Sequence, residues 1–472
     1  MRNFKKSFKI IIRMVIFLVV LIVLNETFRF IVMPPSYARY ILGELNRKED
    51  SYDCIILGAS HGRSAINPYK IDEALNCNAI NMSIPSETVK DSYYLLKESF
   101  RKNNPKTIIF DIDYQYWYKL KQNEYWETFI YEQLDFSSVK LEYIAYNLLE
   151  KDFRVGLTRW AYYFFNGNIN LKENAKLKLS KAYRNNELSV VNNKDAGGSY
   201  VGKGYFYRDD TNGGKGKIKK VRFDTNDLEQ EAVHYFKKMV QFCKKKGIRL
   251  VCITSPITPA TLNYGDYETV HNYFVKLCKE QGVEYYDFNY VKDSVLHFDN
   301  ADFVDYDGHM KGRLAEQFSV VLAKVIKEAP NNSDILNQYF YKDFQEYYSS
   351  VKKVVTNDLI YAFDYAKEKN KYNFKFKSIV IGGPNTKSEV KVIVRNINNN
   401  KTIYEDSKYC DYERLKEYSF DVEEGSYEIV IYARTKGTSV EYEELCRKPF
   451  KIDANEVNVY KTKLAVGDID YE

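Results

Sequence analysis

The sequence predicts an α/β domain whose parallel sheet has helices on both faces, between an N-terminal transmembrane helix and a C-terminal all-β sandwich. A long apolar stretch fills residues 10–33, and short apolar runs then alternate with helical patterns from residue 53 to about 330. Beyond about residue 370, apolar and polar residues alternate strictly. Alternating strands and helices are typical of parallel sheets, whereas a period of two indicates half-buried strands.

The apolar stretch at residues 10–33 is expected to be a membrane anchor. Its core, Met14 to Leu24, has no charged residue, and basic residues precede it. The positive-inside rule therefore places the N-terminus in the cytoplasm and the remainder of the chain outside the membrane. At ~1.5 Å per residue, this stretch is long enough for a bilayer core of roughly 30 Å. A cleaved signal peptide is the alternative, but no small-x-small cleavage site follows, and we favour an uncleaved anchor.

The central region predicts four buried strands, each with a helical pattern close by. The helix expected near 227–246 has an apolar stripe and is followed by Gly247, a typical C-terminal stop. In parallel sheets, reactive groups gather at the carboxyl ends of the strands. Ser60 follows the first of these strands, which are expected at residues 53–57, 106–112, 248–254 and 283–288.

These patterns divide the chain into four parts. Residues 1–35 are expected to form a basic cytoplasmic stub and the transmembrane anchor, and residues 36–330 the α/β domain. A glycine-rich and charged insertion at about 150–225 interrupts that domain and is expected to cover its site. A helical connector is expected at 331–365, and a β-sandwich accessory domain at 366–472.

Composition argues against two classes of partner. The net charge of +6 comes from 70 basic and 64 acidic residues, and no basic stripe with interleaved aromatics is present. We therefore expect no nucleic acid partner. The seven cysteines form no CxxC pair, and no cluster of histidine, cysteine and carboxylate residues has metal-ligand spacing. We accordingly expect no metal and no cofactor.

Ser60, in the sequence GASHG, stands where a buried strand leads into a tight turn. A serine there is either a nucleophile or, more commonly, a helix N-cap. A nucleophilic serine needs a base and a carboxylate that orients the base. His309 is the candidate base, because Asp305 and Asp307 precede it in FVDYDGHM, although a solvated loop with a capping aspartate would look similar. His61 is expected in the pocket wall, because neighbouring side chains diverge in a tight turn.

The order and spacing of several motifs resemble the SGNH/GDSL hydrolase superfamily. The most similar branch consists of membrane-anchored proteins that accompany membrane-bound O-acyltransferases, such as the alginate O-acetylation proteins and the teichoic-acid D-alanylation protein. The resemblance covers roughly residues 1–330 and implies an SGNH-like (flavodoxin-like) parallel sheet. Its motifs are GAS at 58–60, NAINMSIPSETVKDSYYLLKESF at 78–100, PKTIIFDID at 105–113 and DGH at 307–309.

The resemblance implies a role for each matching residue. Ser60 is expected to be the nucleophile, His309 the general base and Asp307 the carboxylate that orients it. Most of the superfamily has this aspartate three residues before the histidine, where this chain has a tyrosine, so Asp305 remains the alternative orienter. The backbone amides of Ser60 and Ser83 are expected to form the oxyanion hole, although serine replaces the usual glycine at the second position.

The expected function is that of a membrane-anchored extracytoplasmic O-acyltransferase. It would transfer an acyl group, foremost acetyl, from a membrane-bound O-acyltransferase partner to the hydroxyls of a cell-surface polysaccharide, through an acyl-serine intermediate. Two alternatives stay open. A carbohydrate esterase or deacetylase would use the same triad, whereas a non-catalytic glycan-binding or scaffold protein would use Ser60 only to cap a helix.

Overall fold

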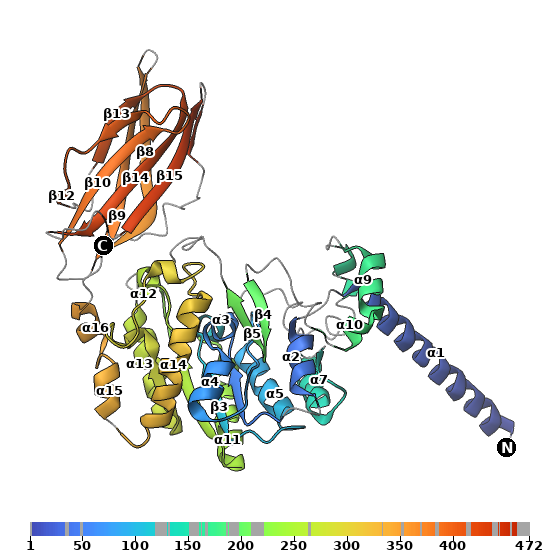
Figure 1. Ribbon diagram of the computed structural model, residues 1–472. Coiled ribbons are helices and arrows are strands. Elements are labelled where there is room, and N and C mark those ends of the chain that lie inside the picture. Colours follow the sequence, from blue (N-terminus) through green and yellow to red (C-terminus); the bar gives the residue numbers. More distant parts are fainter. Residues whose placement is uncertain are drawn as a thin grey trace.

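The computed structural model describes most of the chain in three regions: a projecting N-terminal helix, an α/β unit and a β unit (Figure 1). The described residues are 2–33, 37–47, 51–118, 130, 133–150, 160–161, 163–165, 169–185, 187, 198–208, 221–262, 266–332, 334–350, 354–368, 371–382, 387–411, 417–436, 442, 444–453 and 456–459.

Helix α1 (Arg2–Val32) extends away from the α/β unit (Figure 1). Its segment Phe8–Val32 is long and apolar enough to cross a membrane. Residues 8–24 are all exposed to solvent. The predicted apolar N-terminal helix is therefore confirmed, in a form compatible with a membrane anchor or a signal sequence.

A parallel sheet of five strands lies at the centre of the α/β unit, as the sequence predicts. Its strand order is β2-β1-β3-β6-β7, so the chain moves outward from β1 in both directions. Open α/β sheets bind ligands at such a switch point, outside the carboxyl ends of the strands. Strand β2 was not among the predicted strands, because three residues are too few to show an alternation of apolar and polar side chains. The strands are β1 (Cys54–Leu57), β2 (Ala79–Asn81), β3 (Thr107–Asp111), β6 (Arg249–Thr254) and β7 (Glu284–Asp287).

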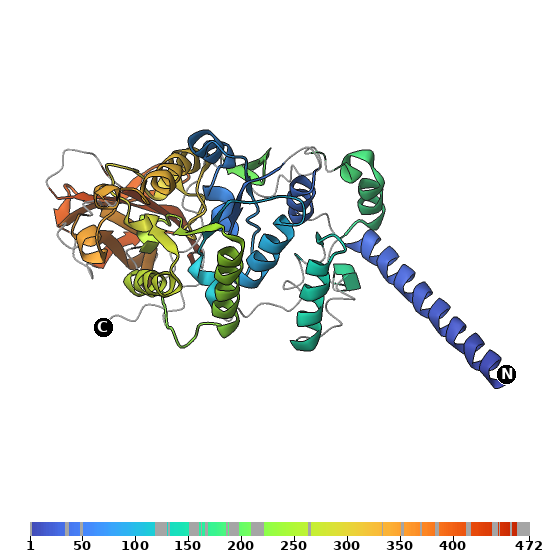
Figure 2. The same cartoon turned by 90° about the horizontal axis from the view of Figure 1, so that it is seen from below.

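Helices cover both faces of this sheet (Figure 2). Alternate side chains of β1 enter different clusters: Ile55 packs in the core with α5, α11 and α13, and Ile56 in the core with α4 and α14. Helix α11 ends at Gly247, whose φ of 67° gives the left-handed stop that the sequence predicts. The covering helices are α3 (Ser60–Ala65), α4 (Pro68–Leu75), α5 (Val89–Ser99), α11 (Gln230–Lys246), α13 (Tyr267–Gln281) and α14 (Gly312–Glu328).

Shorter elements connect and border the sheet. In the region expected as an insertion, the hairpin β4–β5 lies beside β2, where the Asn81 amide donates to the Lys203 carbonyl over 2.8 Å. The ring of Tyr207 in this hairpin lies over Gly312 at the start of α14. These elements are α2 (Tyr37–Leu45), η1 (Tyr114–Trp117), α7 (Ser138–Glu150), α9 (Leu171–Leu179), α10 (Lys181–Arg184), β4 (Gly198–Gly202), β5 (Tyr205–Arg208), α12 (Pro259–Leu262), η5 (Phe288–Tyr290) and η6 (Asn300–Asp302).

The connector expected at 331–365 is helical only in its first part. It contains α15 (Asp334–Tyr339) and α16 (Phe344–Ser350), and strand β8 (Val354–Glu368) then begins inside the expected range. The expectation of a helix up to residue 365 is therefore corrected. The start of β8 reads VVTNDLIYAF, and β-branched and aromatic residues of this kind favour strands.

The C-terminal region is antiparallel, as predicted. One sheet has the order β11-β10-β14-β15-β16 with β12 paired to β10, and the other has the order β13-β9-β8. Val390, Val392 and Val394 are buried on one face of β10, as their alternation predicts. The strands are β9 (Lys371–Gly382), β10 (Ser388–Asn396), β11 (Thr402–Glu405), β12 (Cys410–Asp411), β13 (Glu417–Val422), β14 (Gly425–Thr435), β15 (Glu444–Asp453) and β16 (Glu456–Val459).

Candidate active site

Ser60 lies at the carboxyl edge of the sheet, after strand β1, which lies between β2 and β3. The chain leaves β1 through Gly58 and Ala59, and Ser60 is the first residue of α3. The N-cap position belongs to Ala59, so the capping role considered for Ser60 is not the one that the structure shows. Instead, the Ser60 hydroxyl lies 2.8 Å from Nε2 of His309.

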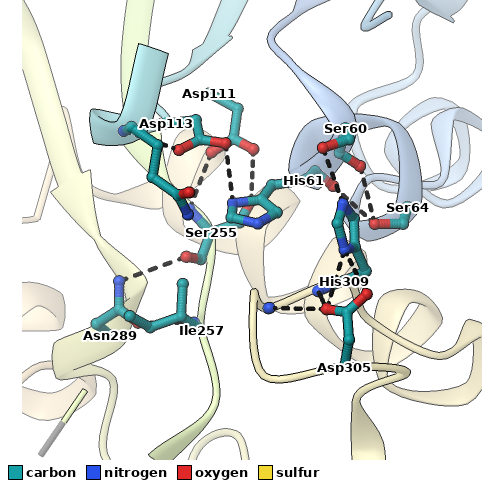
Figure 3. A network of polar contacts seen from close by, with 12 residues as sticks. Ser60, His61, Ser64, Asp111, Asp113, Ser255, Ile257, Asn289, Asp305 and His309 are labelled. Atoms are coloured by element: carbon teal, nitrogen blue, oxygen red, sulfur yellow. Dashed lines mark hydrogen bonds and ion pairs between the residues drawn. The ribbon is translucent and has the colours of Figure 1, made fainter. Parts of the chain in front are cut away.

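His309 lies between Ser60 and Asp305 (Figure 3). Its Nε2 faces the serine hydroxyl, and its Nδ1 lies 2.8 Å and 3.0 Å from the two carboxylate oxygens of Asp305. The side chains of His309 and Asp305 are 18% and 23% exposed, so a substrate can reach a site that is otherwise largely desolvated. Hydroxyl, imidazole and carboxylate thus form one continuous hydrogen-bonded chain.

The carboxylate on His309 is Asp305, which corrects the expectation that Asp307 orients the base. The turn wraps around Asp305, whose Oδ1 accepts hydrogen bonds from the amides of Gly308 and His309 over 3.2 Å and 3.3 Å. Gly308 adopts a φ of 106°, and the Val304 amide closes the loop on the His309 carbonyl over 2.8 Å. This compact turn brings the residue four positions before His309, rather than two, onto its Nδ1.

Neighbouring elements hold this turn in place. The hydroxyl of Thr261, on α12, donates to the Tyr306 carbonyl over 2.7 Å, and the hydroxyl of Thr258 contacts the same oxygen over 3.3 Å. Ile257 lies so close to Gly308 that a Cβ there would come within 3.0 Å of its side chain. The segment after β6 therefore fixes the position of the base.

The electrostatics suit a base that is neutral at rest. Burial lowers the pKa of His309, and the charge of His61 lowers it further, although the hydrogen bond to Asp305 opposes both effects. Burial alone would raise the pKa of Asp305, but the hydrogen bond and charge of His309 outweigh it, and the pKa lies below its usual value. Asp305 is therefore ionised while His309 is free to accept a proton.

His61 forms a second, buried polar group beside the first. It is 6% exposed, its Nδ1 lies 3.2 Å from Oδ2 of Asp113, and its ring centre lies 5.0 Å from that of His309. Burial would lower the pKa of His61, but the charges of Asp113 and Asp111 outweigh it and raise the pKa. The expectation that His61 lies in the wall agrees with this placement, since the ring does not face the Ser60 hydroxyl.

Asp111 is the last residue of β3 and Asp113 follows the strand, and both bring further charge to the carboxyl edge of the sheet. Asp111 accepts from the amide and the hydroxyl of Ser255 over 2.9 Å and 3.0 Å (Figure 3). Burial raises the pKa of Asp111 to about 6. The sequence analysis did not single out this pair, although their position at the end of a predicted strand, on the same edge as Ser60, was a usable signal.

The Ser83 amide, expected as the second oxyanion donor, has a hydrogen-bond partner in the structure. The residue is fully buried, and its amide donates to Oδ1 of Asn81 over 3.0 Å. The side-chain amide nitrogen of Asn81 in turn donates to the carbonyls of Gly62 and Ile66 over 2.9 Å and 2.8 Å. Asn81 thus joins β2 to α3 and engages the Ser83 amide, and the oxyanion role of Ser83 stays a prediction.

Two other donor groups lie beside Ser60. The Ser60 amide belongs to the first turn of α3, where backbone amides lack partners inside the helix. Burial raises the pKa of Tyr116, on η1, while hydrogen bonds with the side chains of Ser86 and Ser60 oppose that rise. Tyr116 was not among the residues singled out from the sequence.

Among the described residues, no group of three or more histidine, cysteine, aspartate and glutamate side chains could hold a metal ion.

Comparisons with known proteins give only weak likenesses. No protein-family model matches the chain, and no curated protein matches it. A GDSL-like lipase from Bacteroides thetaiotaomicron is similar at 8% identity and a TM-score of 0.26, over 58% of this chain and 88% of that chain. A psychrotrophic esterase from Pseudoalteromonas sp. is similar at 9% identity and a TM-score of 0.28, over 59% of this chain and 100% of that chain. We therefore derive the chemistry from the geometry of the site.

Proposed function

We propose that this protein is a serine acyltransferase or esterase that works through an acyl-Ser60 intermediate. The observation that carries the proposal is the hydrogen-bonded chain from Ser60 through His309 to Asp305. Such a chain activates a hydroxyl for attack on an acyl carbonyl, because the imidazole removes its proton and the carboxylate fixes the imidazole tautomer.

The proposed reaction has two halves. In the first, Ser60 Oγ attacks the carbonyl carbon of the donor ester while His309 Nε2 takes the serine proton. The tetrahedral intermediate then expels the donor alcohol, to which His309 returns that proton. In the second half, His309 deprotonates an incoming hydroxyl, which attacks the acyl-serine and releases Ser60 Oγ, reprotonated by His309. Asp305 stays ionised throughout and stabilises the imidazolium that forms twice.

The first candidate for the incoming hydroxyl is a sugar of a cell-surface polysaccharide, with acetyl as the acyl group and a membrane-bound O-acyltransferase as its source. The support for this choice is the motif resemblance, together with the exposed apolar helix α1. An anchor of this kind would place the site outside the membrane, beside a membrane-borne donor. A carbohydrate esterase, in which water takes the place of the sugar hydroxyl, is the second candidate.

The proposal includes the SGNH-like, flavodoxin-like identity of the α/β unit and the sandwich form of the β unit. The strand order β2-β1-β3-β6-β7 supports the first, since it matches the doubly wound order 2-1-3-4-5. One hydrophobic cluster that combines residues of β13 with residues of β10, β14 and β15 supports the second.

An acyl-ester reporter assay on the full-length protein in detergent tests the proposal. We expect release of the acyl group and, by mass spectrometry, an acyl adduct on Ser60. Ser60→Ala should abolish both, whereas Ser51→Ala, at an exposed serine, should leave both unchanged. Faster release with an added oligosaccharide and its acylation would support the transferase; release that ignores the acceptor would support the esterase. Unchanged turnover in Ser60→Ala would overturn the proposal, because the acyl group would then not pass through Ser60, whereas no release by the wild type would support a non-catalytic scaffold.

A further inference from the structure

The C-terminal end of α1 packs against a short segment that lies more than a hundred residues later in the chain. The ring of Trp160 stacks on Phe28, with centres 5.1 Å apart and planes inclined by 17°. The Trp160 indole also donates to Oδ1 of Asn25 over 2.9 Å. An aromatic ring and its polar N–H thus both engage the last turns of the apolar helix.

Helix α9 completes this contact by capping the end of α1. The Asn174 amide donates to the carbonyls of Ile31 and Met33 over 2.7 Å and 2.8 Å. The Lys178 ammonium donates to the carbonyl of Phe30 over 2.6 Å and also to that of Met33. The last carbonyls of a helix lack partners inside it, and a cation there complements the helix dipole. Both side chains are buried, with Asn174 9% and Lys178 4% exposed.

The same two segments also carry exposed apolar side chains. Phe164 and Phe165 are 47% and 78% exposed, and Leu179, at the end of α9, is 64% exposed. Lys172 and Lys176 of α9 are exposed as well. Segments that lie at a membrane surface combine Trp, Phe and Leu side chains, which enter the headgroup–acyl boundary, with lysines whose charged tips stay in water. Figures 1 and 2 both show α9 beside the end of α1.

The length of the exposed apolar surface indicates where the bilayer ends. Residues 8–24 are all exposed and, at ~1.5 Å per residue, extend about 25 Å along the helix. A bilayer core of roughly 30 Å is somewhat thicker. Its outer boundary therefore falls at the turns of α1 that Trp160 contacts.

We propose that residues 160–161, residues 163–165 and α9 form a membrane-interface collar that grips the end of α1 and immerses Phe164, Phe165 and Leu179 in the headgroup–acyl boundary of a phospholipid bilayer. The collar makes the end of α1 a permanent part of the fold, so that α1 is retained rather than removed. This proposal is independent of the acyl chemistry, because it depends only on contacts remote from Ser60.

Depth-dependent quenching of tryptophan fluorescence tests the collar. The full-length protein is reconstituted in vesicles of phosphatidylcholine and phosphatidylglycerol whose acyl chains carry bromine either near the headgroup or near the chain end. The signal of Trp160 is the difference between wild type and Trp160→Phe, which keeps a ring on Phe28. We expect stronger quenching by the bromine near the headgroup. Equal, absent or deeper quenching would overturn the proposal.

Matched variants test the exposed side chains. The double variant Phe164→Ser, Phe165→Ser should reduce the shallow quenching of Trp160 by at least half, because the collar loses its apolar contact with lipid. Val320→Ser, at a 48% exposed position on α14, should leave the quenching unchanged. Undiminished quenching in the double variant would refute the role of the two phenylalanines. The depth measurement on the wild-type protein decides the placement even if the double variant is unstable.

Discussion

Asp305 is the carboxylate that contacts Nδ1 of His309. Both of its carboxylate oxygens face His309 Nδ1, and its Oδ1 also accepts hydrogen bonds from the backbone amides of Gly308 and His309. A carboxylate in this position fixes the histidine tautomer and stabilises the imidazolium that forms during acyl transfer. Asp307, two residues along, therefore serves as a matched control for it.

We predict that Asp305→Asn lowers kcat/KM for an acyl-ester reporter by about 10²–10⁴-fold, because an amide at this position favours the wrong histidine tautomer. Asp307→Asn should stay within a few-fold of the wild type. The measurement is steady-state turnover of both variants, with thermal unfolding to show that they fold. A larger loss in Asp307→Asn than in Asp305→Asn would contradict this assignment.

His61 sets the charge next to the base, and its removal should change the pH profile. Burial and the charge of His61 lower the pKa of His309, so His309 stays neutral at pH values below its ordinary pKa. The acidic limb of the wild-type kcat/KM profile should therefore lie below about pH 6.5. Two other charged groups affect the pKa of His309: Asp305 raises it and Arg208 lowers it. The pKa of His61 is raised by the carboxylates of Asp113, Asp111, Asp305 and Asp307.

In His61→Gln the positive charge is lost, the pKa of His309 rises, and the acidic limb of kcat/KM should move to higher pH. Nitrogen chemical shifts of the histidine rings, measured against pH in the full-length protein, give the same pKa without any turnover. An acidic limb that stays in place, or moves to lower pH, would show that His61 does not tune His309.

The sequence singles out Ser60 and His309, whose side chains meet in the structure, but it does not identify their other partners. Ser60 and His309 stand at the ends of recognisable patterns, a buried strand and a loop before a helix. The choice between Asp305 and Asp307 depends on the left-handed φ of Gly308, which no residue pattern encodes. Likewise, the hydrogen bond from the Ser83 amide to the side chain of Asn81 could not be foreseen, because Asn81 lies on a strand too short to predict.

At the scale of elements, the turn at 303–310 is shaped by a glycine that no other residue replaces easily. Gly308 combines a φ of 106° with a close approach to Ile257. The sequence patterns located the long elements well, including α11 and its glycine stop. They were less informative for β2 and the start of β8, where short length or mixed polarity hides the period.

Gly308→Ala should reduce activity more than its effect on stability explains. The Cβ would strain the backbone and press on Ile257, which displaces His309 from Ser60. We predict at least a tenfold loss of kcat/KM. Gly247→Ala is the control: its φ of 67° is also left-handed, but no atom lies within 4 Å of the added Cβ. It should cost about 1–2 kcal/mol of stability and no activity. Equal activity in the two variants would argue against a strained turn.

At the scale of the whole molecule, the α/β unit and the β unit have separate hydrophobic cores. The clusters on the two faces of the parallel sheet contain residues up to Tyr347, whereas the cluster of the β unit begins with Val392. We therefore predict that a chain ending after residue 350 folds and turns over a small acyl-ester reporter within about threefold of the full chain.

Circular dichroism and reporter kinetics of the shortened chain check this prediction. Normal reporter turnover with impaired acylation of a polymer would assign the β unit a role in holding the acceptor. Loss of the folded state would instead mean that the β unit stabilises the α/β unit.

The turn at 303–310 also has a consequence for how the site tolerates change. Phe303 pairs with Met310 across its base, and both the imidazole and its carboxylate belong to the enclosed residues. The acid–base unit therefore moves as one rigid body. Of the contacts in the chain of three groups, only that between His309 and Ser60 joins distant parts of the sequence, 249 residues apart. The alignment of the site thus depends mainly on one distance, that between the turn at 303–310 and the end of β1.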